Sequence, residues 1–190
     1  MTRMNRPIAL WLAAAVALLG LVVGTAAASS PALFKSQIFN PAFSVPLQPG
    51  WTVAEWDVGA AQIYKKCAGC VHQGQENGEV TLDMALSGST PISAIKRLRG
   101  TPGLVPGPVN SLAIGTLRGW AFTAQRGDLP IVFPRSGYRT DPSGSPLQVI
   151  AVRARGKTLT IFIDPHEATP AQTPRFMKNA TTLLRGLRFR

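Results

Sequence analysis

Alternating apolar and polar positions dominate the chain and predict a sheet of mostly antiparallel strands. In residues 79–86 the side chains of Val80, Leu82, Met84 and Leu86 fall on one side, which is typical of a half-buried strand. Clusters of Pro, Gly and Asn separate such segments and favour turns. Further strands are predicted at 42–47, 51–57, 60–65, 109–114, 117–125 and 131–133, the last inside a long surface loop over 126–146.

A β-hairpin near the end of the chain gives the clearest pairing. Gly156-Lys157 is expected as its two-residue turn. Counting outward from that turn pairs Ala154 with Leu159, Val152 with Ile161 and Ile150 with Ile163. This face is wholly apolar, whereas the opposite face becomes polar near the turn. A helix lying over part of the second face would account for the difference.

Two segments have the 3.6-residue period of a helix. In the first, Thr90 is placed to cap a helix over 91–98, Pro91 suits its first turn, and Gly100 ends it. The second begins at about Thr173 and has one apolar face. We expect it to cover the second face of the hairpin. Its apolar positions are Phe176, Ala180, Leu183, Leu184 and Leu187.

Five segments of the chain follow one another in a characteristic order. They are Phe43-Ser44-Val45-Pro46-Leu47-Gln48-Pro49-Gly50-Trp51, the helix Pro91 to Leu98, Ile114-Gly115, Gly119-Trp120 and Leu187-Arg188-Phe189. On these segments the chain resembles the PsbP-like fold family, which includes secreted bacterial proteins without an assigned activity. The resemblance covers about residues 39–190. It implies an α+β fold in which helices sandwich an antiparallel sheet, and a binding or accessory role without a shared catalytic motif.

Residues 1–28 have the pattern of a secretory signal peptide. Arg3 and Arg6 precede an uncharged apolar run, and Ala26-Ala27-Ala28 supplies a small-residue cleavage site. If the segment stays uncleaved, it is a membrane anchor and the only contact with a membrane that this segment pattern predicts. Residues 29–38 are expected as a linker and 39–190 as the folded domain. The predicted location is periplasmic, envelope-associated or extracellular.

The net charge of the chain indicates what kind of partner it binds. Lys and Arg number 20 against 9 acidic residues, a net charge of +11. Outside the cytoplasm the available polyanions are lipid head groups and wall polymers rather than nucleic acid. Arg153, Arg155 and Lys157 cluster at the hairpin tip and form a candidate docking patch for an anionic surface. A compositional bias toward Arg is the alternative explanation, and an unidentified protein is the alternative partner.

One loop, Cys67-Ala68-Gly69-Cys70-Val71-His72, carries candidate chemistry. In an oxidising compartment the spacing of Cys67 and Cys70 favours a local disulfide. A redox dithiol, or a zinc or copper ion held by Cys67, Cys70 and His72, are alternatives. The loop also resembles the attachment site of a c-type haem, but Val71 stands where that site has His. No cofactor is expected if the disulfide forms.

The remaining candidates point to structure rather than catalysis. Asp164-Pro165-His166-Glu167 contains two acids and an imidazole, but we interpret it as a turn that leads into the final helix. Trp51, Trp56 and Trp120 are expected as core or turn anchors, and two of them in one cleft would indicate a ligand pocket. The sequence therefore predicts an exported non-enzymatic accessory or binding protein. A periplasmic redox, metal or haem protein that uses the Cys67–Cys70–His72 loop is the alternative.

Overall fold

The computed structural model describes residues 31–65, 78–84, 89–127, 131–132, 139–140, 146–165 and 171–190. The predicted signal peptide, residues 1–28, lies outside these ranges. Thirteen strands and two helices occur in the described residues. The strands are β1 (Ala32–Lys35), β2 (Phe43–Leu47), β3 (Trp51–Asp57), β4 (Ala60–Lys65), β5 (Glu79–Met84), β6 (Leu104–Pro106), β7 (Asn110–Ile114), β8 (Leu117–Arg126), β9 (Ile131–Val132), β10 (Arg139–Thr140), β11 (Pro146–Ala154), β12 (Lys157–Asp164) and β13 (Arg188–Phe189), and the helices are α1 (Pro91–Arg99) and α2 (Thr173–Gly186).

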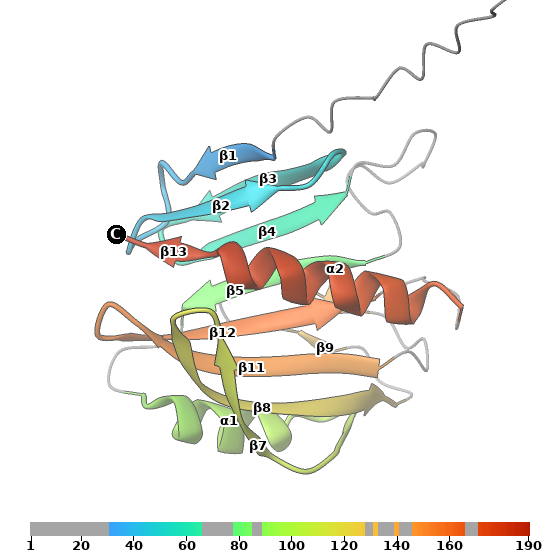
Figure 1. The fold of residues 1–190 in the computed structure, drawn as a ribbon. Helices are drawn as coiled ribbons and strands as arrows, with labels where there is room; N and C mark the ends of the chain where they lie inside the picture. Colours follow the sequence, from blue (N-terminus) through green and yellow to red (C-terminus); the bar gives the residue numbers. More distant parts are fainter. Residues whose placement is uncertain are drawn as a thin grey trace, which may run out of the picture. The chain divides into compact units, whose positions relative to one another are not determined.

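An antiparallel sheet of eight strands organises the domain (Figure 1). Its strand order is β3-β4-β5-β12-β11-β8-β6, and β7 also pairs with β8. A second sheet has the order β1-β2-β13, so the last strand of the chain lies beside one of the first. The two short strands β9 and β10 pair with each other. The sequence predicts an α+β fold with an antiparallel sheet and two helices, and the structure confirms this fold class.

One face of the large sheet packs against α2. The side chains of Leu159, Ile161 and Ile163 on β12 are fully buried in a core that also contains the apolar face of α2. The three-stranded sheet joins this core through Phe43, whose ring is edge-on to Phe39 at 5.3 Å between centroids. The layer on this face is therefore a helix together with a small sheet (Figure 1).

The opposite face carries α1 over β8, β11 and β12. Ala94, Ile95 and Leu98 of the helix are buried in a second core with apolar residues of these strands, among them Phe122 and Phe162. The helix begins as predicted. The Thr90 hydroxyl accepts a hydrogen bond from the Ser93 N–H at 3.2 Å, and the Ser93 hydroxyl accepts one from the Thr90 N–H at 2.8 Å.

The hairpin prediction is right about the faces and wrong about the register. Ala154 pairs with Lys157 and Val152 with Leu159, so the turn residues are Arg155 and Gly156 rather than Gly156 and Lys157. Their φ angles are +47° and +80°. A two-residue turn of the I′ type needs positive φ at both positions. The pairing shifts by two residues, which leaves each side chain on its predicted face.

Two further expectations are wrong. The predicted linker over 29–38 contains β1, whose residue Phe34 lies 5.7 Å from Phe43 between ring centroids. A four-residue strand is too short to show a clear alternation. The C-terminal helix α2 covers the wholly apolar face of the hairpin, and it is α1 that covers part of the second face.

Neither of the two helices in the described residues is long and apolar enough to cross a membrane.

Arg155→Asn is expected to raise the free energy of unfolding by about 1 kcal/mol, because Asn tolerates positive φ better than a long side chain does. Urea unfolding at neutral pH measures the change. Arg153→Asn is the matched control, since the same replacement at a strand position gives no such gain. Equal stabilisation by both variants would contradict this account of the turn.

Candidate functional site

The three basic residues of the predicted patch lie together at the tip of the β11–β12 hairpin. Arg153, Arg155 and Lys157 are all exposed. A hydrogen bond from Arg153 Nη1 to the carbonyl oxygen of Gly156, at 3.0 Å, ties the side chain of Arg153 to the turn. Lys157 Nζ donates to the carbonyl oxygen of Asn40 at 3.4 Å. The hairpin tip is therefore attached to the loop between β1 and β2.

That loop and the β3–β4 turn carry exposed apolar side chains at the same end of the sheet as the basic tip. Asn40 donates its backbone N–H to the carbonyl oxygen of Val58 at 2.9 Å, which joins the loop to the β3–β4 turn. Ile38, Trp56 and Val58 are 50%, 43% and 58% exposed. We call the six residues Ile38, Trp56, Val58, Arg153, Arg155 and Lys157 the tip surface.

Two carboxylates near the tip surface hold backbone in place. Glu55 accepts hydrogen bonds from the backbone N–H groups of Gln37, Ile38 and Phe39 at 2.8 to 3.2 Å. Asp57 accepts one from Gly59 at 2.5 Å. These bonds fix the loop and the turn that present the apolar side chains.

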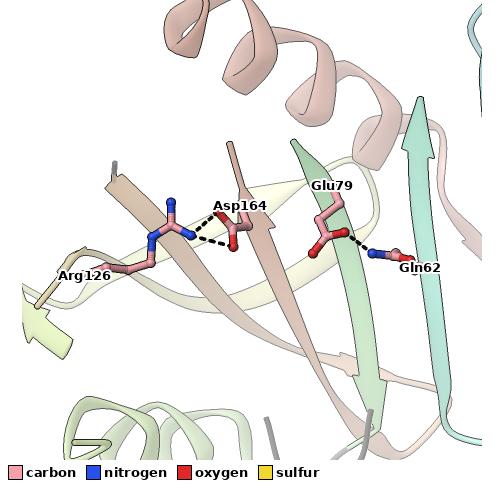
Figure 2. Close-up of polar contacts among 4 residues, drawn as sticks. All are labelled: Gln62, Glu79, Arg126 and Asp164. Carbon is pink, nitrogen blue, oxygen red and sulfur yellow. Dashed lines mark hydrogen bonds and ion pairs between the residues drawn. The ribbon is translucent and has the colours of Figure 1, made fainter. Parts of the chain in front are cut away.

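A row of buried polar side chains crosses the α1 face of the sheet (Figure 2). Arg126 ends β8, Asp164 ends β12, and Glu79 and Gln62 lie on β5 and β4. All four are less than 9% exposed. Arg126 Nη1 is 3.0 Å from each carboxylate oxygen of Asp164, and Gln62 Nε2 donates to Glu79 Oε2 (Figure 2).

The row keeps two neighbouring carboxyl groups in different environments. Asp164 is opposite Glu79 in the pairing of β12 with β5, but only Asp164 has an ion-pair partner at contact distance among the described residues. Burial, and to a smaller extent the negative charge of Asp164, raise the pKa of Glu79 from 4.5 to about 9 against the opposing effect of Arg126. Glu79 is therefore neutral at pH 7.

At pH 7 this row holds one proton, on Glu79, next to the ion pair of Arg126 and Asp164. Among the described residues Glu79 Oε1 and the Thr81 hydroxyl have no hydrogen-bond partner. A neutral acid beside an ionised one is an arrangement used in general acid–base catalysis. Here the side chains are buried, so a substrate would have to displace protein to reach them. We therefore interpret the row as part of the folded core.

The structure corrects several residues that the sequence placed elsewhere. Asp164 is a buried strand residue and not part of a turn, and Arg126 is buried and not in a surface loop. Trp56 and Trp120 are 43% and 38% exposed, so neither is a core anchor. An isolated acid at the end of an apolar strand and an arginine at the end of another are the signals that could have paired Asp164 with Arg126.

The cysteine loop lies outside the described residues. Cys67, Cys70 and His72 therefore stay a prediction, both as a disulfide and as a metal, redox or haem site. In the part of the chain that the structure describes, no three His, Cys, Asp or Glu side chains are grouped so that they could hold a metal ion.

Comparison with known proteins gives likeness in structure alone. No family model matches the chain, and no curated protein matches it by sequence. PsbP (CyanoP) from Synechocystis matches in structure with a TM-score of 0.47 and 10% identity, over 90% of this chain and 99% of that one. The sequence resembles the fold family of that protein.

Two further solved structures are similar to a lesser degree. LpqN, involved in cell envelope biogenesis of Mycobacterium tuberculosis, has a TM-score of 0.41 and 10% identity, over 82% of this chain and 90% of that one. PA94 from Pseudomonas aeruginosa, a protein of unknown function, has a TM-score of 0.40 and 13% identity, over 83% of this chain and 97% of that one. These values describe similarity of the backbone fold only. The candidate site rests on the residues of this chain.

Stability is expected to fall as the pH rises from about 4.5 to about 9. In that window the folded protein keeps the proton of Glu79 while the unfolded chain releases it. The slope for one such group is at most about 1.4 kcal/mol per pH unit. Glu79→Gln removes this contribution, so the variant should be more stable than the wild type at pH 8.

Urea unfolding of both proteins between pH 4 and pH 9 measures the effect. At pH 4, below the unfolded pKa of 4.5, the carboxyl group is mostly neutral in both states, so the stabilities of variant and wild type should agree to within about 1 kcal/mol. A difference that does not change with pH would show that Glu79 is ionised in the folded protein.

Proposed function

We propose that the protein is an exported, non-enzymatic accessory protein of the cell envelope, and that its tip surface docks on an anionic phospholipid bilayer. One observation carries the proposal. The bonds from Lys157 to Asn40 and from Asn40 to Val58 join the basic hairpin tip to the loop and the turn that carry exposed apolar side chains.

The cations supply the electrostatic attraction. Each Lys or Arg near an anionic leaflet contributes on the order of 1 kcal/mol. Three such residues give roughly 3 kcal/mol, or about a hundredfold in affinity. The nearby acids Glu55 and Asp57 oppose this attraction in part, although each accepts backbone hydrogen bonds. Attraction of this kind weakens as salt is added.

The apolar side chains favour a bilayer over a wall polymer. A charged polymer offers phosphate or carboxylate groups but no apolar phase, so exposed Ile, Val and Trp gain nothing from it. At a bilayer these side chains enter the interface, and the amphipathic ring of Trp is enriched there. Trp56, at the bulge between Glu55 and Asp57, is the residue placed to do so.

The proposal gives the protein no catalytic step. Glu79 and Asp164, the two acids that lie together, and Arg126 belong to the buried row, which we interpret as part of the folded core. An accessory protein needs only a stable scaffold and a docking surface. The hydrogen bonds from backbone N–H groups to Glu55 hold the loop that contributes Ile38 to the docking surface.

Vesicle sedimentation with protein from an exporting bacterial host tests the docking. Binding to vesicles containing phosphatidylglycerol should exceed binding to pure phosphatidylcholine, and added salt should weaken it. Arg155→Glu/Lys157→Glu should reduce the affinity at least tenfold, by the loss and reversal of two charges. Trp56→Ser should also weaken binding, with less dependence on salt.

Lys96→Glu/Arg97→Glu on α1 is the control, because it makes the same change of charge at exposed residues that are not part of the tip surface. An equal loss of binding in this variant would show that net charge alone attracts the vesicles. Unchanged binding of the hairpin variant would reject the tip surface as the docking site.

A further inference from the structure

A pocket of about 380 Å³ lies where the first turns of α2 meet the paired ends of β3 and β4. Trp51 begins β3 at the pocket, whereas Trp56 and the tip surface are at the other end of that strand. The pocket is thus separate from the proposed docking site. Its described lining residues are Gln48, Pro49, Trp51, Lys65, Gln172, Arg175, Phe176 and Asn179.

The turn before β3 positions two of these side chains. Gly50 has a φ of +81°, which a glycine adopts without strain. The Trp51 N–H then donates to the carbonyl oxygen of Gln48 at 3.0 Å. Trp51 is opposite Lys65 in the pairing of β3 with β4, so both side chains leave the same face of the sheet.

Two aromatic rings form a rigid wall of the pocket. Trp51 stacks on Phe176 with 6.1 Å between ring centroids and 15° between the planes. Gly78 lies close to Phe176, since a Cβ at that position would be 2.5 Å from the ring. The ring of Phe176 is therefore confined on that side by backbone, and half-buried Trp51 contributes an apolar surface to the pocket.

The charged side chains in the described part of the lining are both basic. Lys65 comes from the sheet and Arg175 from the helix, and the described lining contains no acidic residue. Gln48, Gln172 and Asn179 add amide groups that can donate hydrogen bonds. Because Arg175 and Asn179 are four positions apart on α2, they lie on one side of the helix.

We propose that this pocket binds a small anionic molecule with a flat apolar part. The anionic group lies between Lys65 and Arg175, where charge-assisted hydrogen bonds are strongest. The flat part lies against Trp51, whose ring favours offset stacking. The volume is at the lower end of the range of ligand sites and suits a molecule of one or two fused rings.

Isothermal titration of the full chain with four probes tests the ligand class. Naphthoate and naphthyl phosphate carry the anion and the flat part, naphthamide lacks the charge, and acetate lacks the rings. Both naphthyl anions are expected to bind more tightly than naphthamide and acetate, and the tighter of the two identifies the anionic group. Naphthamide that binds as tightly as both anions, or no binding of either anion, would overturn the proposal.

Two variants of α2 locate the site. Arg175→Met should weaken binding of the tighter anion about tenfold, through the loss of a charge-assisted bond. Lys178→Met is the matched control, since Lys178 is an exposed cation of the same helix that does not line the pocket. Equal affinities of the two variants would place the probe elsewhere. Neither result depends on vesicle binding, so this test and that of the tip surface can fail separately.

Discussion

Strand β12 is buried on both faces from Thr158 to Asp164, and the rest of the domain is arranged around this requirement. A strand with no exposed face needs a cover on each side of the sheet. On one side the cover is α2 with the three-stranded sheet, and on the other it is α1. Strand β13 directly follows α2 and pairs with β2, so the helix that covers the apolar face is tied to the three-stranded sheet.

The α1 face of β12 is only partly apolar, and this shapes the polar row. Thr158, Thr160 and Asp164 alternate with apolar residues along the strand, and all three are buried. Arg126 neutralises Asp164 from β8, two strands away in the sheet. A buried pair of this kind adds little net stability but is costly to break. Glu79, next to the pair, avoids the cost of a buried charge by staying neutral.

Periodicity predicted the elements well, and tertiary contacts decided what it could not. The longer strands and both helices follow from alternation, from the Thr90 cap and from the apolar stripe that includes Phe176 and Leu183. The short strands β1, β6, β10 and β13 were not predicted. The hairpin register failed because Arg155 takes a backbone conformation that its type disfavours. The assignment of helices to faces failed because either stripe could cover either face.

The candidate sites needed the folded chain for a similar reason. The basic tip was visible as three neighbouring residues, but Ile38 and Trp56 join it only through hydrogen bonds between loops that are distant in sequence. The pocket combines Trp51 with Phe176, more than a hundred residues apart. No local sequence pattern predicts a contact between residues so far apart. Arg126 and Asp164 are 38 positions apart, and their contact joins the ends of two strands that are not neighbours in the sequence.

The neutral state of Glu79 couples the folding of this chain to the binding of a proton at pH 7. This carboxyl group takes up a proton as the chain folds, because it is ionised in the unfolded chain and neutral in the folded one. The heat measured on unfolding therefore includes the heat with which the buffer accepts that proton. Through this one group, the protein senses the pH between about 4.5 and about 9 without any change in its contacts with a partner.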